Sequence, residues 1–362
     1  MQYNSYMLQL RDRPVTKGSE RQVTAMDGRR GTDGRTRFRK AAALFAALFL
    51  LLPQSFCAVQ ADGQKPRTTR PPLVTEPPAD EPETPERDAE GFLAEGEFIH
   101  EDDEGGLWMY LSPTLQVTIR RQRDRSIPLV WFETEILARG EERFRTVMTD
   151  LDRPGKKYKF PYTIAREEGF VLGFTDDFYA ERMKKKQTVG IIIREGQILS
   201  VKTAGKRTSH LPNLDMMIQY PDGRLEVCGC TEYTAEELLE KGALNVFSFG
   251  PILIRDGEID EKMYSSYYRD LEPRHALGMI EPGHYLLLSV QGRRKDSKGT
   301  ILQRVAEMMK ERGVTQALNL DGGNTMALMF RGRMLNKEAV YQNRSFVRSV
   351  TSLIGIGSTE IP

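Results

Sequence analysis

The sequence predicts an α+β domain, in which a mixed sheet contains a βαβ crossover, helices flank the sheet and the N-terminal part is rich in strands. An apolar run over 285–290 precedes apolar residues at helical spacing over 300–312, and a second apolar run follows over 317–320. A strand, a helix and a strand within so few residues imply a parallel, right-handed crossover. Upstream, three segments have strand-like composition, namely 107–111, 115–121 and 127–137.

The two strands of this crossover end in polar, glycine-containing turns. Residues 291–294 follow the first strand, and residues 321–325 place Asp321 on a two-glycine turn after the second. Neighbouring parallel strands end at the same edge of a sheet, where open α/β sheets usually bind ligands. We therefore expect both turns to face one crevice.

The other elements follow from local signals. Turn residues over 194–197 and 221–224 predict two hairpins, Gly242 and Gly313 are placed as helix stops, and the Gly250–Pro251 pair breaks an apolar run. Short helices are expected over 162–168 and 235–242. Further strands are expected over 144–149, 170–174, 189–193, 198–200, 216–220, 225–230, 245–254, 327–334 and 348–356.

The N-terminal region predicts export. Residues 1–40 are polar and increasingly basic, and residues 41–52 form an uncharged apolar run that Pro53 closes. This is the pattern of a signal peptide or signal anchor. We divide the chain into this segment (1–61), a Pro- and acid-rich disordered linker (62–105) and a folded domain (106–362). The product is expected to be secreted or held at the outer face of the cytoplasmic membrane, with membrane contact only through the N-terminal segment.

Composition narrows the possible partners. The formal net charge of +1 gives no bulk attraction to nucleic acid, and none is expected as a partner. Cys228 and Cys230 are two residues apart, which favours two packed thiols over a strained bridge. The sequence has no pair or cluster of histidines at the spacing of metal ligands, so no cofactor is expected. A divalent cation held by Asp176 and Asp177 is kept as an alternative.

The order of several motifs resembles the phosphodiester glycosidase family over most of the domain, about residues 108–356. Each motif alone is weak, but their order together is specific. They are G-F-T-D-D-F-Y at 173–179, G-I-I-I-R-E-G at 190–196, S-F-G-P at 248–251, E-P-R-H-A-L-G at 272–278, Q-G-R at 291–293, N-L-D-G-G-N-T at 319–325 and R-S-V at 348–350. The sequence departs from the family pattern at Thr175, Asp176, His275 and Gln291.

The resemblance implies hydrolysis of a sugar-1-phosphodiester at the anomeric carbon, with a glycan or sugar-phosphate as substrate. It places Asp321 and Asp177 as carboxylates near the developing oxocarbenium ion, and His275 as a candidate proton carrier. Substrate binding is assigned to the residues around them. These are Arg274, Arg293, Arg348, Asp176, Asn324, Thr325 and the glycines Gly250, Gly292, Gly322 and Gly323.

Structural roles are the alternative for each of these residues. Asp321 can cap its turn, His275 can pack in the core, and the arginines can be solvated surface charges. At the level of the whole protein, the alternative is a member of the family that has lost turnover and binds or organises extracellular polysaccharide. The replacements at Thr175, Asp176 and Gln291 favour that alternative, and the retained acids and arginines favour an enzyme.

Overall fold

The computed structural model describes residues 73–75, 80–150, 157–176, 190–202, 214–265 and 268–361. The chain divides into two compact units, Met1–Gly63 and Gln64–Pro362, and all described residues belong to the second. The expected export segment and Asp177 lie outside the described residues. None of the helices described is both long and apolar enough to cross a membrane.

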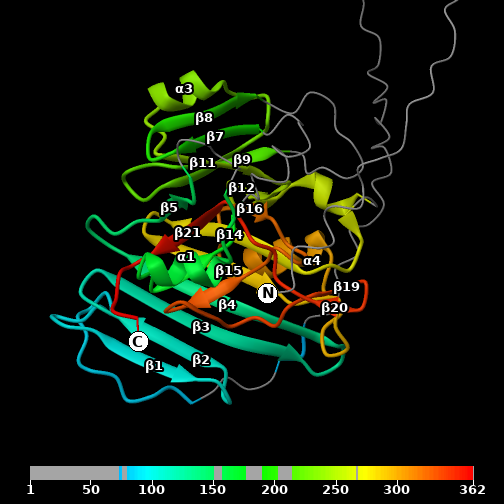
Figure 1. The fold of residues 1–362 in the computed structure, drawn as a ribbon. Helices are drawn as coiled ribbons and strands as arrows, with labels where there is room; N and C mark the ends of the chain where they lie inside the picture. The colour runs from blue at the N-terminus through cyan, green and yellow to red at the C-terminus, as the bar shows by residue number, and fades with distance from the viewer. Residues whose placement is uncertain are drawn as a thin grey trace, which may run out of the picture. The chain divides into compact units, whose positions relative to one another are not determined.

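Antiparallel sheets make up most of the described fold (Figure 1). The largest has nine strands, in the order β1-β2-β3-β4-β15-β14-β16-β12-β13. Its strands are β1 (Phe98–Asp102), β2 (Leu107–Leu111), β3 (Leu115–Asp124), β4 (Leu129–Ala138), β12 (Ile252–Arg255), β13 (Glu258–Ile259), β14 (Arg274–Glu281), β15 (His284–Val290) and β16 (Gln316–Leu320).

Two five-stranded sheets and a small hairpin complete the strands. One sheet has the order β10-β9-β11-β7-β8, the other has the order β18-β17-β6-β21-β5, and β19 pairs with β20. The first contains β7 (Gly190–Arg194), β8 (Gln197–Lys202), β9 (Asp215–Gln219), β10 (Leu225–Cys228) and β11 (Asn245–Phe249). The second contains β5 (Arg145–Met148), β6 (Leu172–Phe174), β17 (Leu328–Phe330), β18 (Arg333–Met334) and β21 (Ser352–Ile356), and the hairpin is β19 (Val340–Tyr341) and β20 (Arg344–Ser345).

Each of the three sheets has one face on a common core and one face covered by a helix. The core takes Leu277 from the large sheet, Phe247 from the β7–β11 sheet and Phe174 from the β6–β21 sheet. On the opposite faces lie α4 (Leu302–Glu311), α3 (Ala235–Glu240) and α1 (Pro161–Glu167), respectively. A short 3₁₀ helix, η1 (Glu261–Tyr264), packs near α4. Successive side chains of a strand point to the common core and to the covering helix in turn, so strands such as β9 and β21 are buried along their whole length.

The predicted α+β class is wrong, although most of the predicted elements exist. Helix in the described residues is limited to α1, α3, α4 and η1, and the sheets are antiparallel. The expected crossover is also different from a simple βαβ unit. β15 and β16 are joined by α4 and run in the same direction, but β14 lies between them and pairs antiparallel with both. The sequence pattern shows the strand–helix–strand unit and cannot show the strand inserted into it.

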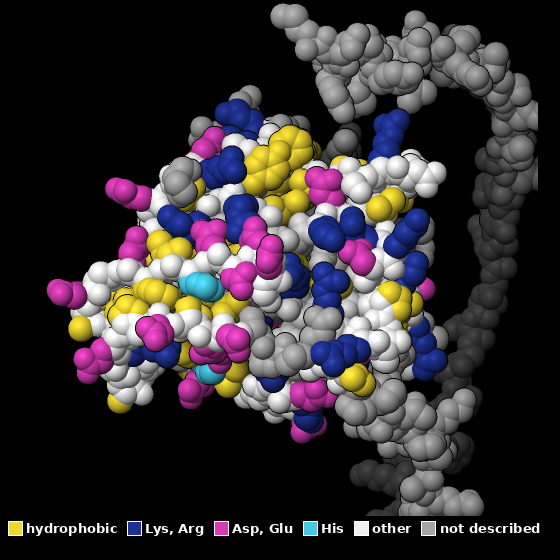
Figure 2. Space-filling view, turned by 90° about the horizontal axis from the view of Figure 1, so that it is seen from below, with side chains coloured by type: hydrophobic (Ala, Val, Ile, Leu, Met, Phe, Trp, Pro, Cys, Tyr) yellow, Lys and Arg dark blue, Asp and Glu magenta, His cyan; other side chains and the backbone are white. Residues whose placement is uncertain are grey.

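The domain's sheet begins earlier than expected. β1 pairs with β2 along its whole length, from Phe98 opposite Leu111 to Asp102 opposite Leu107. Phe92 and Leu93 are buried as well. The structure therefore places the last part of the segment 62–105, which was expected to be a linker, in the fold. Acidic, basic and hydrophobic side chains all occur on the face shown in Figure 2.

Close packing of α4 against the large sheet depends on Gly278 in β14. A Cβ at this position would lie 2.6 Å from Val314 Cγ1, 2.9 Å from Met309 Cε and 3.0 Å from the backbone oxygen of Gln316. We expect Gly278→Ala to lower the free energy of unfolding by about 1–3 kcal/mol, because the strand and helix must move apart. Urea denaturation would measure this change.

Gly229→Ala is the matched control for that substitution. Its Cβ would come within 3 Å only of the Glu232 carboxylate, at 2.8 Å from Oε1, and this flexible side chain can move away. The control should lose less than about 1 kcal/mol. Equal losses at the two glycines would contradict the packing argument.

Candidate functional site

The candidate site lies where the start of β14 passes between the ends of β15 and β16. Arg274 pairs with Val290 at the end of β15, and His275 pairs with Leu320 at the end of β16. The turns after both strands therefore meet the segment that enters β14. The sequence prediction that the two turns share one sheet edge is confirmed, although the strands are not neighbours.

Two glycines allow the turns to close on Pro273. A Cβ on Gly292 would lie 2.6 Å from the Pro273 backbone nitrogen, and a Cβ on Gly322 would collide with the Pro273 carbonyl oxygen. That same oxygen accepts a hydrogen bond from the Gly323 N–H at 3.2 Å. These two positions need glycine because backbone lies directly against them.

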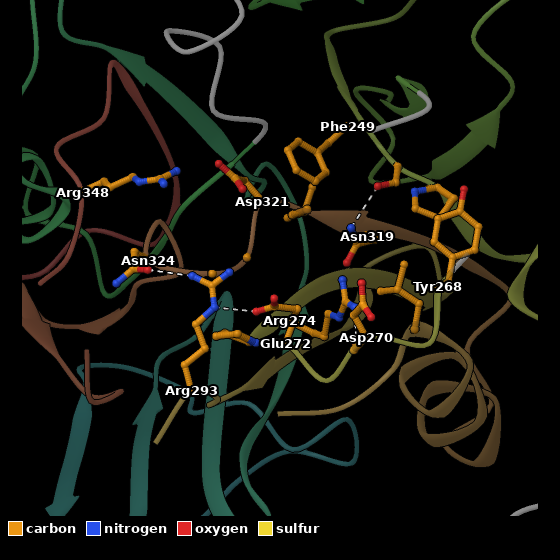
Figure 3. A pocket seen from close by; sticks show the side chains of 17 residues that line it. Phe249, Tyr268, Asp270, Glu272, Arg274, Arg293, Asn319, Asp321, Asn324 and Arg348 are labelled. Carbon is orange, nitrogen blue, oxygen red and sulfur yellow. Dashed lines mark hydrogen bonds and ion pairs between the residues drawn. The ribbon is translucent and has the colours of Figure 1, made fainter. Parts of the chain in front are cut away.

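A cavity of about 570 Å³ opens at this edge. The lining residues come from the turns, the β14 entry and the segments around them (Figure 3). They are Phe249, Gly250, Pro251, Tyr268, Asp270, Glu272, Pro273, Arg274, Arg293, Leu302, Asn319, Leu320, Asp321, Gly322, Gly323, Asn324 and Arg348. Three arginines and three acids are among them, so the formal charges of the described lining cancel.

Arg293 is fixed at the wall of the cavity. Its Nε donates to Glu272 Oε2 at 2.6 Å and its Nη1 donates to Asn324 Oδ1 at 2.8 Å. Its backbone has a φ of 57°, in the left-handed region that a side chain rarely adopts. Residues held in such conformations cluster at functional sites. The second terminal nitrogen, Nη2, has no hydrogen-bond partner in the described part of the chain.

Arg274 lies at the floor of the same cavity. Its Nε donates to the Thr300 carbonyl at 3.1 Å, and its Nη2 donates to the Asp270 carbonyl at 2.7 Å. Burial lowers the pKa of Arg274 to about 10, and the nearby Glu272 and Asp270 act in the opposite direction. The guanidinium therefore stays charged at neutral pH. Each guanidinium is held at Nε and at one terminal nitrogen, which leaves the other terminal nitrogen, Nη1 of Arg274 and Nη2 of Arg293, for a ligand.

Asp321 is delivered by β16 onto the turn that faces the cavity. Its backbone N–H donates to the Asp176 carbonyl at 3.1 Å, which joins the turn to the end of β6. Asp176 itself is 1% exposed and does not line the cavity. Its carboxylate pairs with Arg194 Nη2 at 3.5 Å and accepts a hydrogen bond from Ser352. Asp176 therefore connects sheets and positions Asp321, and the structure gives no support for direct contact between its carboxylate and a substrate.

His275 is buried away from the cavity. It lies on the opposite face of β14 from Ala276, is fully buried, and shares a hydrogen bond of 2.9 Å between Nδ1 and Ser289 Oγ. Its ring lies edge-on to Phe174. Burial lowers the pKa of His275 to about 3, so the ring is neutral near pH 7. This placement argues against the expected role as a proton carrier.

Of the remaining predicted site residues, some line the cavity and others lie behind its lining. Gly250 lines the cavity with φ 78°, and Arg348 lies at its exposed side. Asn324 holds the β19–β20 hairpin, since its Nδ2 donates to the carbonyls of Ala339 at 2.6 Å and Phe346 at 3.1 Å. Thr325 and Gly292 are buried behind the lining. Gln291, the replacement in the Q-G-R motif, is also buried and accepts from the Lys337 N–H at 2.9 Å.

Sequence reasoning missed several lining residues. Glu272 and Asn319 stand inside the recognised motifs, so the motifs themselves were a signal for them. Tyr268 and Asp270 precede β14 in a segment without a pattern, and only the tertiary fold brings them to the cavity. Among the described residues no group of three or more His, Cys, Asp or Glu side chains is arranged to hold a metal ion. The cation alternative at Asp176 and Asp177 stays a prediction, because Asp177 is outside the described residues.

A family model described as phosphodiester glycosidase matches residues 168–357, which is more than half of the chain. The chain belongs to the phosphodiester glycosidase family. The match includes the turns that carry Arg274, Arg293 and Asp321, so the candidate cavity lies inside the family domain.

Two relatives show how far the likeness extends. The catalytic domain of zebrafish N-acetylglucosamine-1-phosphodiester α-N-acetylglucosaminidase, solved in a form auto-inhibited by its pro-peptide, has a TM-score of 0.52 and 18% identity, covering 75% of this chain and 90% of that one. It shares the fold. The SPbeta prophage-derived uncharacterized protein YomE of Bacillus subtilis strain 168 is 26% identical over 168 residues. That match covers 46% of this chain and 25% of YomE, so the chain spans about a quarter of that relative.

The buried neutral histidine predicts a specific pH dependence of stability. The unfolded state takes up a proton near pH 6.5, whereas folded His275 does so only near pH 3. Because the unfolded state binds more protons in this window, stability should fall as pH falls from about 6.5 toward 3, by up to about 1.4 kcal/mol per pH unit. Urea denaturation of the wild type and of His275→Gln at several pH values would measure the difference in slope.

The half-buried His100 on β1 provides the control. His100→Gln makes the same chemical change at a ring that is not enclosed in the core, so a change of slope seen in both variants would not come from the burial of His275. Equal slopes for wild type and His275→Gln would show that His275 does not titrate as its burial requires.

Proposed function

We propose that this chain hydrolyses a sugar-1-phosphodiester. The anomeric C–O bond breaks, its electron pair leaves with the phosphate as a phosphomonoester, and water supplies the hydroxyl to the sugar and a proton to the medium. The observation that carries this proposal is the single cavity that Asp321 lines together with the two anchored guanidinium groups of Arg274 and Arg293.

The arginines suit the phosphate. A guanidinium matches phosphate oxygens, and in each arginine Nε and one terminal nitrogen are already bonded to protein groups while the other terminal nitrogen is left for the ligand. The phosphate is a good leaving group once its charge is balanced, so little general-acid catalysis is required. Glu272 bonds to Arg293 and thereby fixes the direction of that guanidinium.

Asp321 suits the developing positive charge at the anomeric carbon. A carboxylate beside an oxocarbenium-like transition state acts as nucleophile, base or electrostatic stabiliser. Its turn is held by the bond to the Asp176 carbonyl and by the contact of Gly322 with Pro273. Asp177 remains the proposed second carboxylate, from the family motif at 173–179. The named sugar of the zebrafish relative, N-acetylglucosamine, is the first substrate to test.

A second candidate is a family member that binds glycan without turnover. The observation that favours it is the balance of charge in the cavity, where Asp270, Glu272 and Asp321 offset the three arginines. A cavity with no net positive charge attracts a phosphodiester less strongly than two unopposed guanidinium groups do.

Substitution of Asp321 separates the two candidates. With methyl diesters of glucose-1-phosphate and N-acetylglucosamine-1-phosphate, we expect the wild type to release sugar and Asp321→Ala to lower the rate by about 10²–10⁴-fold. Arg274→Ala and Arg293→Ala should each weaken binding by roughly 10- to 100-fold, because each loses a charge-assisted bond to phosphate. Sugar release would be followed by a reducing-sugar assay.

Arg224→Ala is the control, because this arginine lies outside the cavity and bonds to Glu226. It should change neither rate nor binding. Binding of the diesters without release by the wild type would support the glycan-binding candidate. Release that persists in Asp321→Ala would remove this residue from the mechanism.

We propose further that the substrate is met outside the cytoplasm. Support comes from the basic segment and apolar run over residues 1–52. In a bacterial host, the full chain should appear in the medium or at the outer face of the cytoplasmic membrane. Protease added to cells with an intact cytoplasmic membrane should digest it there. A chain that lacks residues 1–61 should stay inside and be protected. Protection of the full chain would contradict export.

A further inference from the structure

Asn319 has an unusual position among the cavity residues. It lies on β16, two residues before Asp321, and is only 5% exposed although it lines the cavity. Asn319 pairs with Ala276, which belongs to the cluster on the α4 face of the sheet, and Arg274 precedes Ala276 by two residues on the same strand. The side chains of Asn319 and Arg274 therefore share one face of the sheet.

Three bonds to one segment fix the Asn319 side chain and backbone. Its backbone N–H donates to the Pro251 carbonyl at 3.1 Å, and its carbonyl accepts from the Gly250 N–H at 3.0 Å. Its side-chain Nδ2 donates to the Gly250 carbonyl at 2.9 Å. This last bond sets the orientation of the amide, because a flipped amide would place two acceptor oxygens against each other.

The side-chain oxygen of Asn319 takes no part in these three bonds. Asn319 Oδ1 is buried and has no hydrogen-bond partner among the residues that the structure describes. In Figure 3 this oxygen points away from the bond to the Gly250 carbonyl and toward the side of the cavity where Arg274 lies. A buried acceptor without a donor is costly, and native proteins retain few of them. This oxygen is therefore available to a donor from a ligand in the cavity.

We infer that Asn319 Oδ1 accepts a hydrogen bond from an O–H or N–H group of the sugar, on the carbon next to the anomeric carbon. This inference rests on the proposed function, in which Asp321 faces the anomeric carbon. Residues i and i+2 of a strand lie about 7 Å apart, so Asn319 reaches a neighbouring substituent and not the reacting bond. The arginines offer only donors, whereas the Asn319 amide oxygen supplies an acceptor.

Asn319 is thus a specificity-determining residue. A site with a buried polar group that expects a partner rejects an analogue without that partner more strongly than an apolar pocket rejects a missing methylene. The predicted preference is for a sugar with a donor at C2 over its 2-deoxy analogue. Whether that donor is a hydroxyl or the N–H of an acylamino group is decided by the comparison below.

Non-hydrolysable ligands test the inference without turnover. The probes are monomethyl esters of C-glycosyl phosphonates, in which carbon replaces the anomeric oxygen. The sugar is glucose, its 2-acetamido analogue, or its 2-deoxy or 3-deoxy analogue. Binding is measured by calorimetry. We expect the wild type to bind the 2-deoxy ligand roughly tenfold more weakly than the better of the glucose and 2-acetamido ligands. The tighter of these two identifies the donor as hydroxyl or amide.

Asn319→Leu should remove the discrimination. This variant keeps the branched side-chain shape and loses both the acceptor and the Nδ2 bond to the Gly250 carbonyl, so its affinities for the 2-deoxy ligand and its parent should agree within about twofold. The ratio of the affinities for the 3-deoxy ligand and the glucose ligand should be the same in the wild type and in the variant. Gln316→Ala, on the same strand and outside the cavity, should keep the wild-type preference.

The outcomes separate this inference from the proposed function. Equal binding of the 2-deoxy ligand and its parents to the wild type overturns the inference alone, and this comparison needs no folded variant. Retained discrimination in a folded Asn319→Leu also overturns it. If none of the ligands binds the wild type, the proposed function and the inference that rests on it both fall.

Discussion

The structure of the site depends on the passage of one short segment, residues 272–274, between two glycine turns. Gly292 and Gly322 approach the backbone of Pro273 from the two sides, and neither position has space for a Cβ. Thr300 pairs with the backbone of Glu272 in both directions, at 3.2 and 3.1 Å. Because this contact is between backbones, it fixes the separation of the two turns, and with it the relative positions of Arg274, Arg293 and Asp321.

The same constraint explains the anchoring of the charged groups. Glu272 belongs to the segment that passes between the turns, and Arg293 belongs to the turn of Gly292. Their ion pair, with 2.6 Å between Nε and Oε2, links the same two segments through side chains. The left-handed conformation of Arg293 turns its side chain toward Asn324, which in turn holds the β19–β20 hairpin. Asp176, whose carbonyl accepts from the Asp321 N–H, forms a second, buried ion pair with Arg194 of the β7–β11 sheet. Positioned donors of this kind can act on a ligand's charge with little reorganisation.

The replacements relative to the family motifs take structural roles here. Gln291 holds the backbone of Lys337, Thr175 Oγ1 accepts from the Ala327 N–H at 3.1 Å, and His275 packs in the core against Phe174. None of these three side chains lines the cavity. The replacements therefore leave the described cavity with its aspartate and arginines, which weakens the sequence argument that they signal a loss of turnover.

The sequence by itself determined the local elements and the family. Alternation, turn residues and the break at Gly250–Pro251 predicted the positions of most strands and of α1, α3 and α4, and the motif order predicted the phosphodiester glycosidase domain. It also predicted that Asp321, Arg274 and Arg293 would meet. Only the tertiary structure decided the fold class, because the insertion of β14 between β15 and β16 is a long-range pairing that no local period encodes. The burial of His275 and Asp176, and the arrival of Tyr268 and Asp270 at the cavity, were decided in the same way, since exposure depends on which sheets pack together.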